Sequence, residues 1–405
     1  MIGCGCVVAA LCPRGHVLNK VSRMGTVYSY RSRDSMIALE KAIAGSMPDV
    51  IVPCDDRAVW QLHELHEKRP ALRPLIEASI GKPDSFDAVC HRTELMAAAQ
   101  RMGLAVPETR VIHSEEDIGG WFREFAGAAV VKVDGTWGGS GVAIVTSAEQ
   151  ATAAWRRFRA PAPLALAWKR WLINRDPLAF WSRRQATAHS VSLQRYIPGR
   201  PANAMAACWQ GQVLGMASVE VLCSQGPTGA STIVRLIRSE EIATAVIALA
   251  RGLGLSGFCG LDFILEEGTG TAYLIELNAR CTQLGHLVLP GQGDLAGLLC
   301  AKLGARGAPK SERPIDRDVI AFFPQALAWN PENPYMQQCY YDVPWSEPAL
   351  VRELLRQPWA ERQWLSRLYH RMRGRKPDPL PSTGHFLRLA ARLGFSSDPT
   401  GVIVK

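Results

Sequence analysis

Two runs of alternating apolar and polar residues, joined by the glycine turn Gly268–Gly270, constrain the fold of this chain most strongly. The stretch GLDFILEEGTGTAYLIELNAR, residues 260–280, predicts two antiparallel strands that form a hairpin. If the pairing is symmetric about Thr269, Asp262 lies opposite Glu276, because each is seven residues from the centre. Side chains directly opposite each other have Cβ atoms about 4.5–5.5 Å apart. Two carboxylates at that distance repel unless something neutralises them.

The second strand of this hairpin carries a row of polar side chains. Residues two apart point to the same face of a sheet, so Glu276, Asn278 and Arg280 form one row. The alternate residues are expected to anchor the strand in the core: Ile275, Leu277 and Ala279. Two carboxylates and an amide oxygen suit Mg²⁺ with bridging phosphates. A solvated sheet face with an incidental pair of acids explains the same pattern without any ligand.

A glycine-rich loop follows an earlier apolar strand. In VVKVDGTWGGSGV, Lys132 on the strand precedes four glycines: Gly135, Gly138, Gly139 and Gly141. Glycines let backbone N–H groups approach phosphate oxygens, and a strand lysine supplies a fixed cation. The loop is not a Walker A loop, in which the lysine follows the glycines. A plain hairpin turn explains the loop taken alone, but the loop and the carboxylate–amide hairpin together form a much more specific combination.

These two segments resemble the ATP-grasp superfamily of ATP-dependent ligases, with similarity from about Pro48 to Leu303. The lysine strand and its glycine loop are similar to the family's phosphate-covering loop. The hairpin is similar to the family's metal hairpin, which ends in Glu-x-Asn-x-Arg. The resemblance implies an α/β fold in which two α+β subdomains clasp ATP. A parallel α/β domain would precede them, and a helical extension would follow.

The resemblance also implies the metal and catalytic residues. Asp262 and Glu276 would hold Mg²⁺, with Glu276 bridging two ions and Asn278 on the second. Arg280 would face the γ-phosphate and an acyl-phosphate intermediate, and Lys132 would be the other catalytic cation. ATP and two Mg²⁺ ions are the expected cofactors, with Mn²⁺ as a substitute.

The expected ATP-binding residues follow from the same resemblance. They are Arg92, Lys132, Gly135, Gly138, Gly139, Ser140, Gly141, Gln194, Arg195, Ile197 and Asn203. Arg195 and Ile197 would contact adenine through backbone groups, and Asn203 would take a ribose-contacting place that is often an acid. Other positions depart from the family as well: Gln194 replaces a frequent Glu, and His91–Arg92 replaces the usual Asp-Lys. After the hairpin, His286 is either an acceptor of the amine's proton or a structural or surface histidine, and the second interpretation is favoured.

The chain divides into four expected parts: a parallel α/β domain at 1–85, whose completeness stays open, ATP-grasp subdomains at 86–192 and 193–310, and a mostly helical basic extension at 311–405. Residues Asp49–Pro53 are expected to form a strand of the first part, followed by a helix. A helix is expected at 92–102. Another should begin after Ser239 and end at Gly252.

The implied function is an ATP- and Mg²⁺-dependent acid–amine ligase. It would activate a small-molecule carboxylate as an acyl phosphate and couple it to an amine or another nucleophile, releasing ADP and phosphate. The alternatives are a small-molecule kinase on the same fold and a nucleotide-binding module without chemistry. The sequence identifies neither substrate, and it leaves the oligomeric state open, a homo-oligomer included.

The distribution of charge and the use of cysteine bear on the partners and the cellular compartment of the protein. Of the net charge of +9, residues 351–405 supply +7, from eleven Lys and Arg against four acids. The nearly neutral remainder argues against a nucleic-acid partner. The basic tail fits either a helix packed on its own domain or a membrane-surface helix, and packing is favoured. Eleven cysteines scattered in apolar runs suggest reduced thiols and a cytoplasmic protein.

Overall fold

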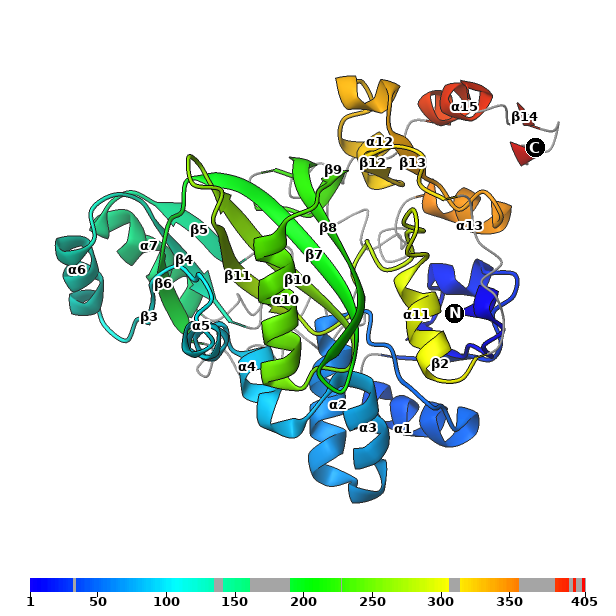
Figure 1. The fold of residues 1–405 in the computed structure, drawn as a ribbon, viewed down its shortest axis with the longest axis horizontal. Helices are drawn as coiled ribbons and strands as arrows, with labels where there is room; N and C mark the ends of the chain where they lie inside the picture. The colour runs from blue at the N-terminus through cyan, green and yellow to red at the C-terminus, as the bar shows by residue number, and fades with distance from the viewer. Residues whose placement is uncertain are drawn as a thin grey trace.

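A computed structural model describes residues 1–31, 34–134, 141–160, 190–226, 228–305, 314–356, 383–392, 396–397 and 403–404 (Figure 1). Four residues expected in the phosphate-covering loop lie outside this set: Gly135, Gly138, Gly139 and Ser140. Most of the basic segment after 356 lies outside it as well. Among the described helices, none is both long and apolar enough to cross a membrane.

The N-terminal region contains a parallel pair of strands beside three helices. Its elements are η1 (Ile2–Cys4), β1 (Ala10–Pro13), η2 (Val17–Lys20), β2 (Val27–Tyr30), α1 (Ser35–Ser46), α2 (Asp56–Lys68), η4 (Pro70–Leu72) and α3 (Arg73–Ile80). The three helices share an apolar core that includes Leu39, Leu62 and Ile76. Buried apolar residues spaced three or four apart on α2, such as Leu62 and Leu65, explain how this helix packs.

The strand expected at Asp49–Pro53 is wrong. These residues join no sheet in the described structure. Their backbone groups find other partners: Ile51 N–H donates to Ser79 Oγ at 2.9 Å, and Pro53 O accepts from Cys281 N–H at 2.9 Å. A side chain and a loop therefore satisfy the hydrogen bonds that a neighbouring strand would have supplied.

A four-stranded antiparallel sheet follows, in the order β3-β6-β4-β5. The elements of this region are η5 (Pro83–Ser85), α4 (Phe86–Cys90), α5 (Arg92–Arg101), β3 (Thr109–Val111), α6 (Glu115–Glu124), β4 (Ala129–Val133), β5 (Val142–Val145), α7 (Ala148–Arg159) and β6 (Val191–Arg195). Helices α6 and α7 bury Ile118 and Trp155 against the sheet. The helix expected at 92–102 is confirmed as α5.

The second sheet has seven strands in the order β11-β10-β7-β8-β9-β12-β13. Its first five strands and two helices are β7 (Gly199–Trp209), β8 (Gln212–Ser224), β9 (Ser231–Leu236), α10 (Glu240–Leu253), β10 (Gly257–Glu266), β11 (Ala272–Asn278) and α11 (Leu295–Lys302). Strand β7 alternates between two cores: Ala204 faces the core with α5 and α10, and Met205 faces the core with α11. A strand buried on both faces needs apolar side chains in both directions, which explains its run of alanines.

Helix α10 begins as expected, because the Ser239 side chain caps it by accepting from Ile242 N–H. It ends one half-turn later than expected. Gly254, with φ +60°, is the left-handed residue that closes the helix, and Gly252 lies inside it.

The C-terminal region is not simply a helical extension. Strand β12 (Val319–Phe322) pairs antiparallel with β9, and β13 (Tyr340–Asp342) pairs parallel with β12, so both extend the second sheet. The other elements are α12 (Gln325–Trp329), η6 (Pro334–Gln337), α13 (Pro348–Leu354), α15 (Thr383–Arg392), β14 (Ser396–Ser397) and β15 (Ile403–Val404). The helices of this region pack on a core with Ile233 of β9.

The hairpin β10–β11 has the expected register at its acidic pair, and Asp262 lies opposite Glu276. On the side of the turn the register shifts by one residue, since Phe263 lies opposite Leu274. Ile275 is therefore an extra residue, a β-bulge beside the acidic pair. Leu274 is fully buried and Ile275 is partly exposed, so the expectation that Ile275 anchors the strand is wrong.

Candidate functional site

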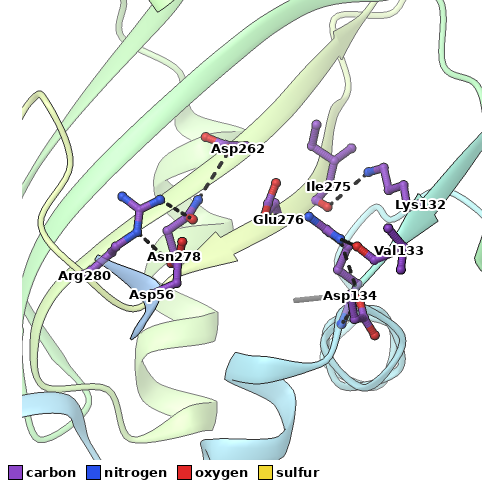
Figure 2. Close-up of polar contacts among 10 residues, drawn as sticks. Asp56, Lys132, Val133, Asp134, Asp262, Ile275, Glu276, Asn278 and Arg280 are labelled. Atoms are coloured by element: carbon purple, nitrogen blue, oxygen red, sulfur yellow. Dashed lines mark hydrogen bonds and ion pairs between the residues drawn. The ribbon is translucent and has the colours of Figure 1, made fainter. Parts of the chain in front are cut away.

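The polar residues of the hairpin meet the end of β4 and the start of α2 (Figure 2). In Figure 2, Lys132 and Asp134 lie on one side of Glu276, and Asp262, Asn278, Arg280 and Asp56 lie on the other. The structure thus gathers residues from three distant segments around one pair of carboxylates: the start of α2, the end of β4 and the hairpin.

Asp262 lies between two amide side chains. Asn203 on β7, its partner in the strand register, donates from Nδ2 to Asp262 Oδ1, and Asn278 Nδ2 approaches Oδ2 at 3.4 Å. Burial and the neighbouring Glu276 carboxylate raise the pKa of Asp262 to about 6. A buried carboxylate beside a second one is a position that favours a cation.

Glu276 is paired with the first residue of α5. Arg92 donates from Nη2 to Glu276 Oε1 at 2.9 Å and from Nη1 to the Val133 carbonyl at 2.8 Å. Its side chain is 11% exposed, and its Nε is buried without a hydrogen-bond partner among the described residues. Asp134, a buried acid that receives a hydrogen bond from Ser190 Oγ at 2.6 Å, lies 3.7 Å from Nη1. Arg92 is therefore linked to the expected phosphate site through its ion pair with Glu276.

Lys132 projects from β4 toward the bulge. Its Nζ lies 3.5 Å from the Ile275 carbonyl, and the side chain is buried. Burial, reinforced by nearby Arg92, lowers the pKa of Lys132 to about 8. The lysine is thus a desolvated cation facing the two carboxylates, and the irregular backbone at Ile275 contributes to its surroundings.

Arg280, just after β11, is held at two points. Its Nε donates to Asp56 Oδ1 at 2.7 Å, and its Nη2 donates to Asn278 Oδ1 at 3.1 Å. Asp56 is the first residue of α2, 224 positions earlier in the chain. Sequence reasoning missed Asp56, Asp134 and Ser190. The only signal was the pair of acids that ends VIVPCDD, taken there as the polar end of a strand.

The residues expected near adenine and ribose lie on β6, β7 and the link between them. Gln194 is buried, and its Nε2 donates to Thr109 Oγ1 at 3.0 Å. Arg195 N–H donates to the Glu108 carbonyl at 2.8 Å, and Ile197 is buried. Asn203 lies beside Asp262 instead of standing apart from the acids. The nucleotide contacts of these residues stay predictions.

Two further residues have clear places. Gly141, the first described residue after the glycine loop, accepts at its carbonyl from Val133 N–H at 3.0 Å. His286 pairs through Nε2 with Asp342 Oδ1 on β13 at 2.7 Å. That contact fits a structural histidine joining the loop after Arg280 to the C-terminal strands.

Comparison with known proteins finds a matching domain family. The profile of the ATP-grasp domain matches residues 178–283, which include β7–β11 and the acidic hairpin. Over these residues the chain matches the ATP-grasp domain family. The large chain of carbamoyl phosphate synthase from Neisseria gonorrhoeae is 24% identical over 243 residues, covering 59% of this chain but only 21% of that protein. The corresponding protein of Neisseria meningitidis serogroup B is 23% identical over the same length.

Solved structures agree on the fold. The biotin carboxylase domain of Hydrogenobacter thermophilus 2-oxoglutarate carboxylase, solved with MgADP and bicarbonate, has a TM-score of 0.56 at 14% identity, covering 75% of this chain and 66% of that chain. The L-amino acid ligase of Bacillus licheniformis has a TM-score of 0.52 at 16% identity, covering 76% of this chain and 78% of that chain. The ATP-grasp fold expected from the hairpin and the lysine strand is confirmed.

The residues around the acidic pair fit a divalent cation. Within the described part of the chain, no three His, Cys, Asp or Glu side chains gather as a metal site. A cation here would therefore take Asp262 and Glu276 and complete its shell with the Asn278 oxygen, water or phosphate. Burial and, after it, the Glu276 carboxylate raise the pKa of Asp262, and a bound cation would favour the ionised form again. This donor set matches hard oxygen-binding ions such as Mg²⁺.

Proposed function

We propose that the chain is an ATP- and Mg²⁺-dependent ligase. In this proposal it activates a small-molecule carboxylate as an acyl phosphate and couples it to an amine or another nucleophile, forming a C–N bond with an amine and releasing ADP and phosphate. The observation that carries the proposal is the opposed pair Asp262 and Glu276, surrounded by the cations Lys132, Arg92 and Arg280. ATP-grasp proteins of known activity share this fold, but the fold alone does not fix the chemistry.

The chemistry needs charge stabilisation more than a nucleophile from the protein. A carboxylate is a poor electrophile, and attack on the γ-phosphate of ATP gives it a leaving group. The transition state spreads negative charge over phosphoryl oxygens, so fixed cations lower the barrier. Lys132, desolvated and facing the hairpin, would contact the phosphates, and Arg280 would face the transferred group.

Bound Mg²⁺ would neutralise the phosphates and orient the γ-phosphoryl group. Asp262, Glu276 and Asn278 would hold it, and Mn²⁺ is expected to substitute. Arg92 now neutralises Glu276, and its guanidinium would remain close enough to stabilise phosphate charge when that acid binds a cation. Gln194, Arg195, Ile197 and Asn203 would line the nucleoside end, and the loop 135–140 would cover the phosphates.

The decisive experiment is a screen of carboxylates in pairs with amino acids and other amines, measuring ADP and phosphate together. Release of both that requires the acid and the amine, with a coupled product by mass spectrometry, supports the ligase. Acid- or alcohol-dependent ADP without phosphate release would instead indicate a kinase. Tight Mg·ATP binding without turnover for any pair would contradict both and indicate a binding module. The variant Glu276→Gln is the matched negative control, because it keeps the shape and removes the charge.

A further inference from the structure

The N-terminal region contacts the reacting end of the hairpin at two adjacent points. The Asp56 carboxylate accepts from Arg280 Nε at 2.7 Å, and the Pro53 carbonyl accepts from the Cys281 N–H at 2.9 Å. One contact is between side chains and the other between backbones, so the segment 53–56 is fixed against 280–281 in both position and direction.

The helix that carries Asp56 is held in place along one face. Asp56, Trp60 and His63 are four and three residues apart, a spacing that aligns them on a helix. Trp60 packs edge-on against His91, with ring centroids 6.3 Å apart, and His63 Nδ1 lies 3.3 Å from Cys90 Sγ. Cys90 and His91 directly precede Arg92. The same face of α2 therefore contacts the segments leading to both sides of the acidic pair.

Arg280 needs such support. An arginine side chain has about 2 kcal/mol of rotamer entropy to lose when it is fixed. Here the side chain is 23% exposed, and its partner Asp56 is 34% exposed, so neither is fixed by deep burial. The contacts to Asp56 and Asn278 use Nε and Nη2, which sets the plane of the guanidinium. Nη1 is then the donor with which Arg280 would reach an anionic ligand.

We infer that Asp56 is a positioning residue for Arg280, and this inference rests on the proposed function, in which Arg280 faces the γ-phosphate. Asp56 holds the guanidinium plane so that Nη1 meets the phosphoryl group, and it does not itself contact the nucleotide. The N-terminal region thereby supplies a part of the phosphate site that the hairpin alone does not contain.

A double-mutant cycle tests this inference on the full chain. The measured quantity is the ratio of the Kd for Mg·ADP to the Kd for Mg²⁺ with a non-hydrolysable ATP analogue, which reports contact with the γ-phosphate. Asp56→Asn should lower this ratio by about tenfold, and Arg280→Gln should lower it at least as far. Because Asp56 acts through Arg280, adding Asp56→Asn to Arg280→Gln should lower the ratio no further. Affinity for Mg·ADP should change little in any variant.

Two matched variants complete the design. Glu124→Gln removes an acid from another arginine pair, with Arg110 at 2.6 and 2.7 Å, and should leave the ratio unchanged. Asp56→Glu restores the charge and should recover most of the ratio. If Asp56→Asn unfolds the chain, Asp56→Ser, chosen for a native-like Tm, takes its place in the cycle, because it also removes the carboxylate that holds Arg280.

The inference is overturned if Asp56→Asn keeps the wild-type ratio, or lowers it equally in the Arg280→Gln background. It stands, and the ligase proposal falls, if the wild type discriminates the two nucleotides in this way yet turns over no acid. If the wild type catalyses ligation and Asp56→Asn keeps the wild-type ratio, the ligase proposal stands and the inference about Asp56 falls. A wild type that binds neither nucleotide overturns both.

Discussion

Arg92 donates to Glu276 across 2.9 Å and, with its second terminal nitrogen, to the Val133 carbonyl. The resemblance placed Arg92 among the phosphate cations, whereas here it neutralises the acid expected to bridge two metal ions. Glu276 is 33% exposed on its side chain and Arg92 is 11% exposed, so the pair is largely shielded from solvent. A shielded pair loses more when one partner is removed than a surface pair does.

The first prediction concerns this pair. Arg92→Met should lower the free energy of unfolding by about 1–3 kcal/mol, because Glu276 is left beside Asp262 without its cation. The variant Arg156→Met breaks an exposed pair with Glu115 and should cost less than about 1 kcal/mol. Urea denaturation in chelator-containing buffer measures both. Equal losses in the two variants would contradict the special role of Arg92.

The second prediction concerns pH and Asp262. Burial, and then Glu276, raise the pKa of this carboxyl from 3.8 to about 6. The folded state therefore binds the proton more tightly than the unfolded state, and this contribution to stability is complete below about pH 4 and lost as pH rises through 6. Without Mg²⁺, Asp262→Asn should gain stability relative to the wild type between pH 4 and 7. If the unfolding free energies of the wild type and of Asp262→Asn changed in parallel with pH, the raised pKa of Asp262 would be refuted.

The third prediction concerns Lys132, whose pKa is lowered from 10.5 to about 8 by burial and by Arg92. Here the unfolded state holds the proton more tightly, so wild-type stability should rise between pH 8 and 10 relative to Lys132→Met, at the limit by about 3 kcal/mol. Affinity for Mg·ATP should fall in the wild type over the same range and be at least tenfold weaker in the variant at pH 7. Calorimetric titrations check the affinities. Unchanged binding in Lys132→Met would exclude the lysine from the phosphate site.

The fourth prediction separates the two residues at the bulge. Leu274 is fully buried, so Leu274→Ala should cost about 2–5 kcal/mol of unfolding free energy. Ile275→Ala removes a partly exposed side chain and should cost less than about 1.5 kcal/mol. Deleting Ile275 should leave a regular hairpin in which Glu276 still lies opposite Asp262. It should weaken Mg·ATP binding, because it removes the irregular backbone whose carbonyl lies 3.5 Å from Lys132 Nζ. A larger loss of unfolding free energy for Ile275→Ala than for Leu274→Ala would contradict the bulge and support the simple alternation expected from the sequence.

The hairpin was predictable because turn chemistry and strand period act locally. Next to the turn, however, Phe263 lies opposite Leu274, a register that would place Asp262 opposite Ile275, and the bulge restores the predicted pairing of Asp262 with Glu276. The bulge at Ile275 was not predictable, since an extra residue leaves the apolar and polar letters of the strand almost unchanged. Leu274 and Ile275 are equally apolar, and only the packing of the finished sheet selects which one is buried.

The partners of the site residues come from distant segments, which local patterns do not connect. Asp56 joins Arg280 across 224 positions, and nothing in VIVPCDD specifies that contact. The same holds for the strand expected at Asp49–Pro53, whose backbone bonds go to Ser79 and Cys281. Its apolar residues indicated a partly buried segment. Whether that segment is a strand or an extended connection depends on whether another strand lies beside it, and here a side chain and a loop do.

Strand β12 protects the molecule against association with other copies of itself. It occupies the hydrogen-bonding edge of β9, where Ile233 and Val234 are buried. A chain cut after residue 310 would leave that apolar edge open, and open edges recruit strands from other molecules. The C-terminal strands therefore cover this edge, and a fragment that ends at residue 310 is expected to self-associate.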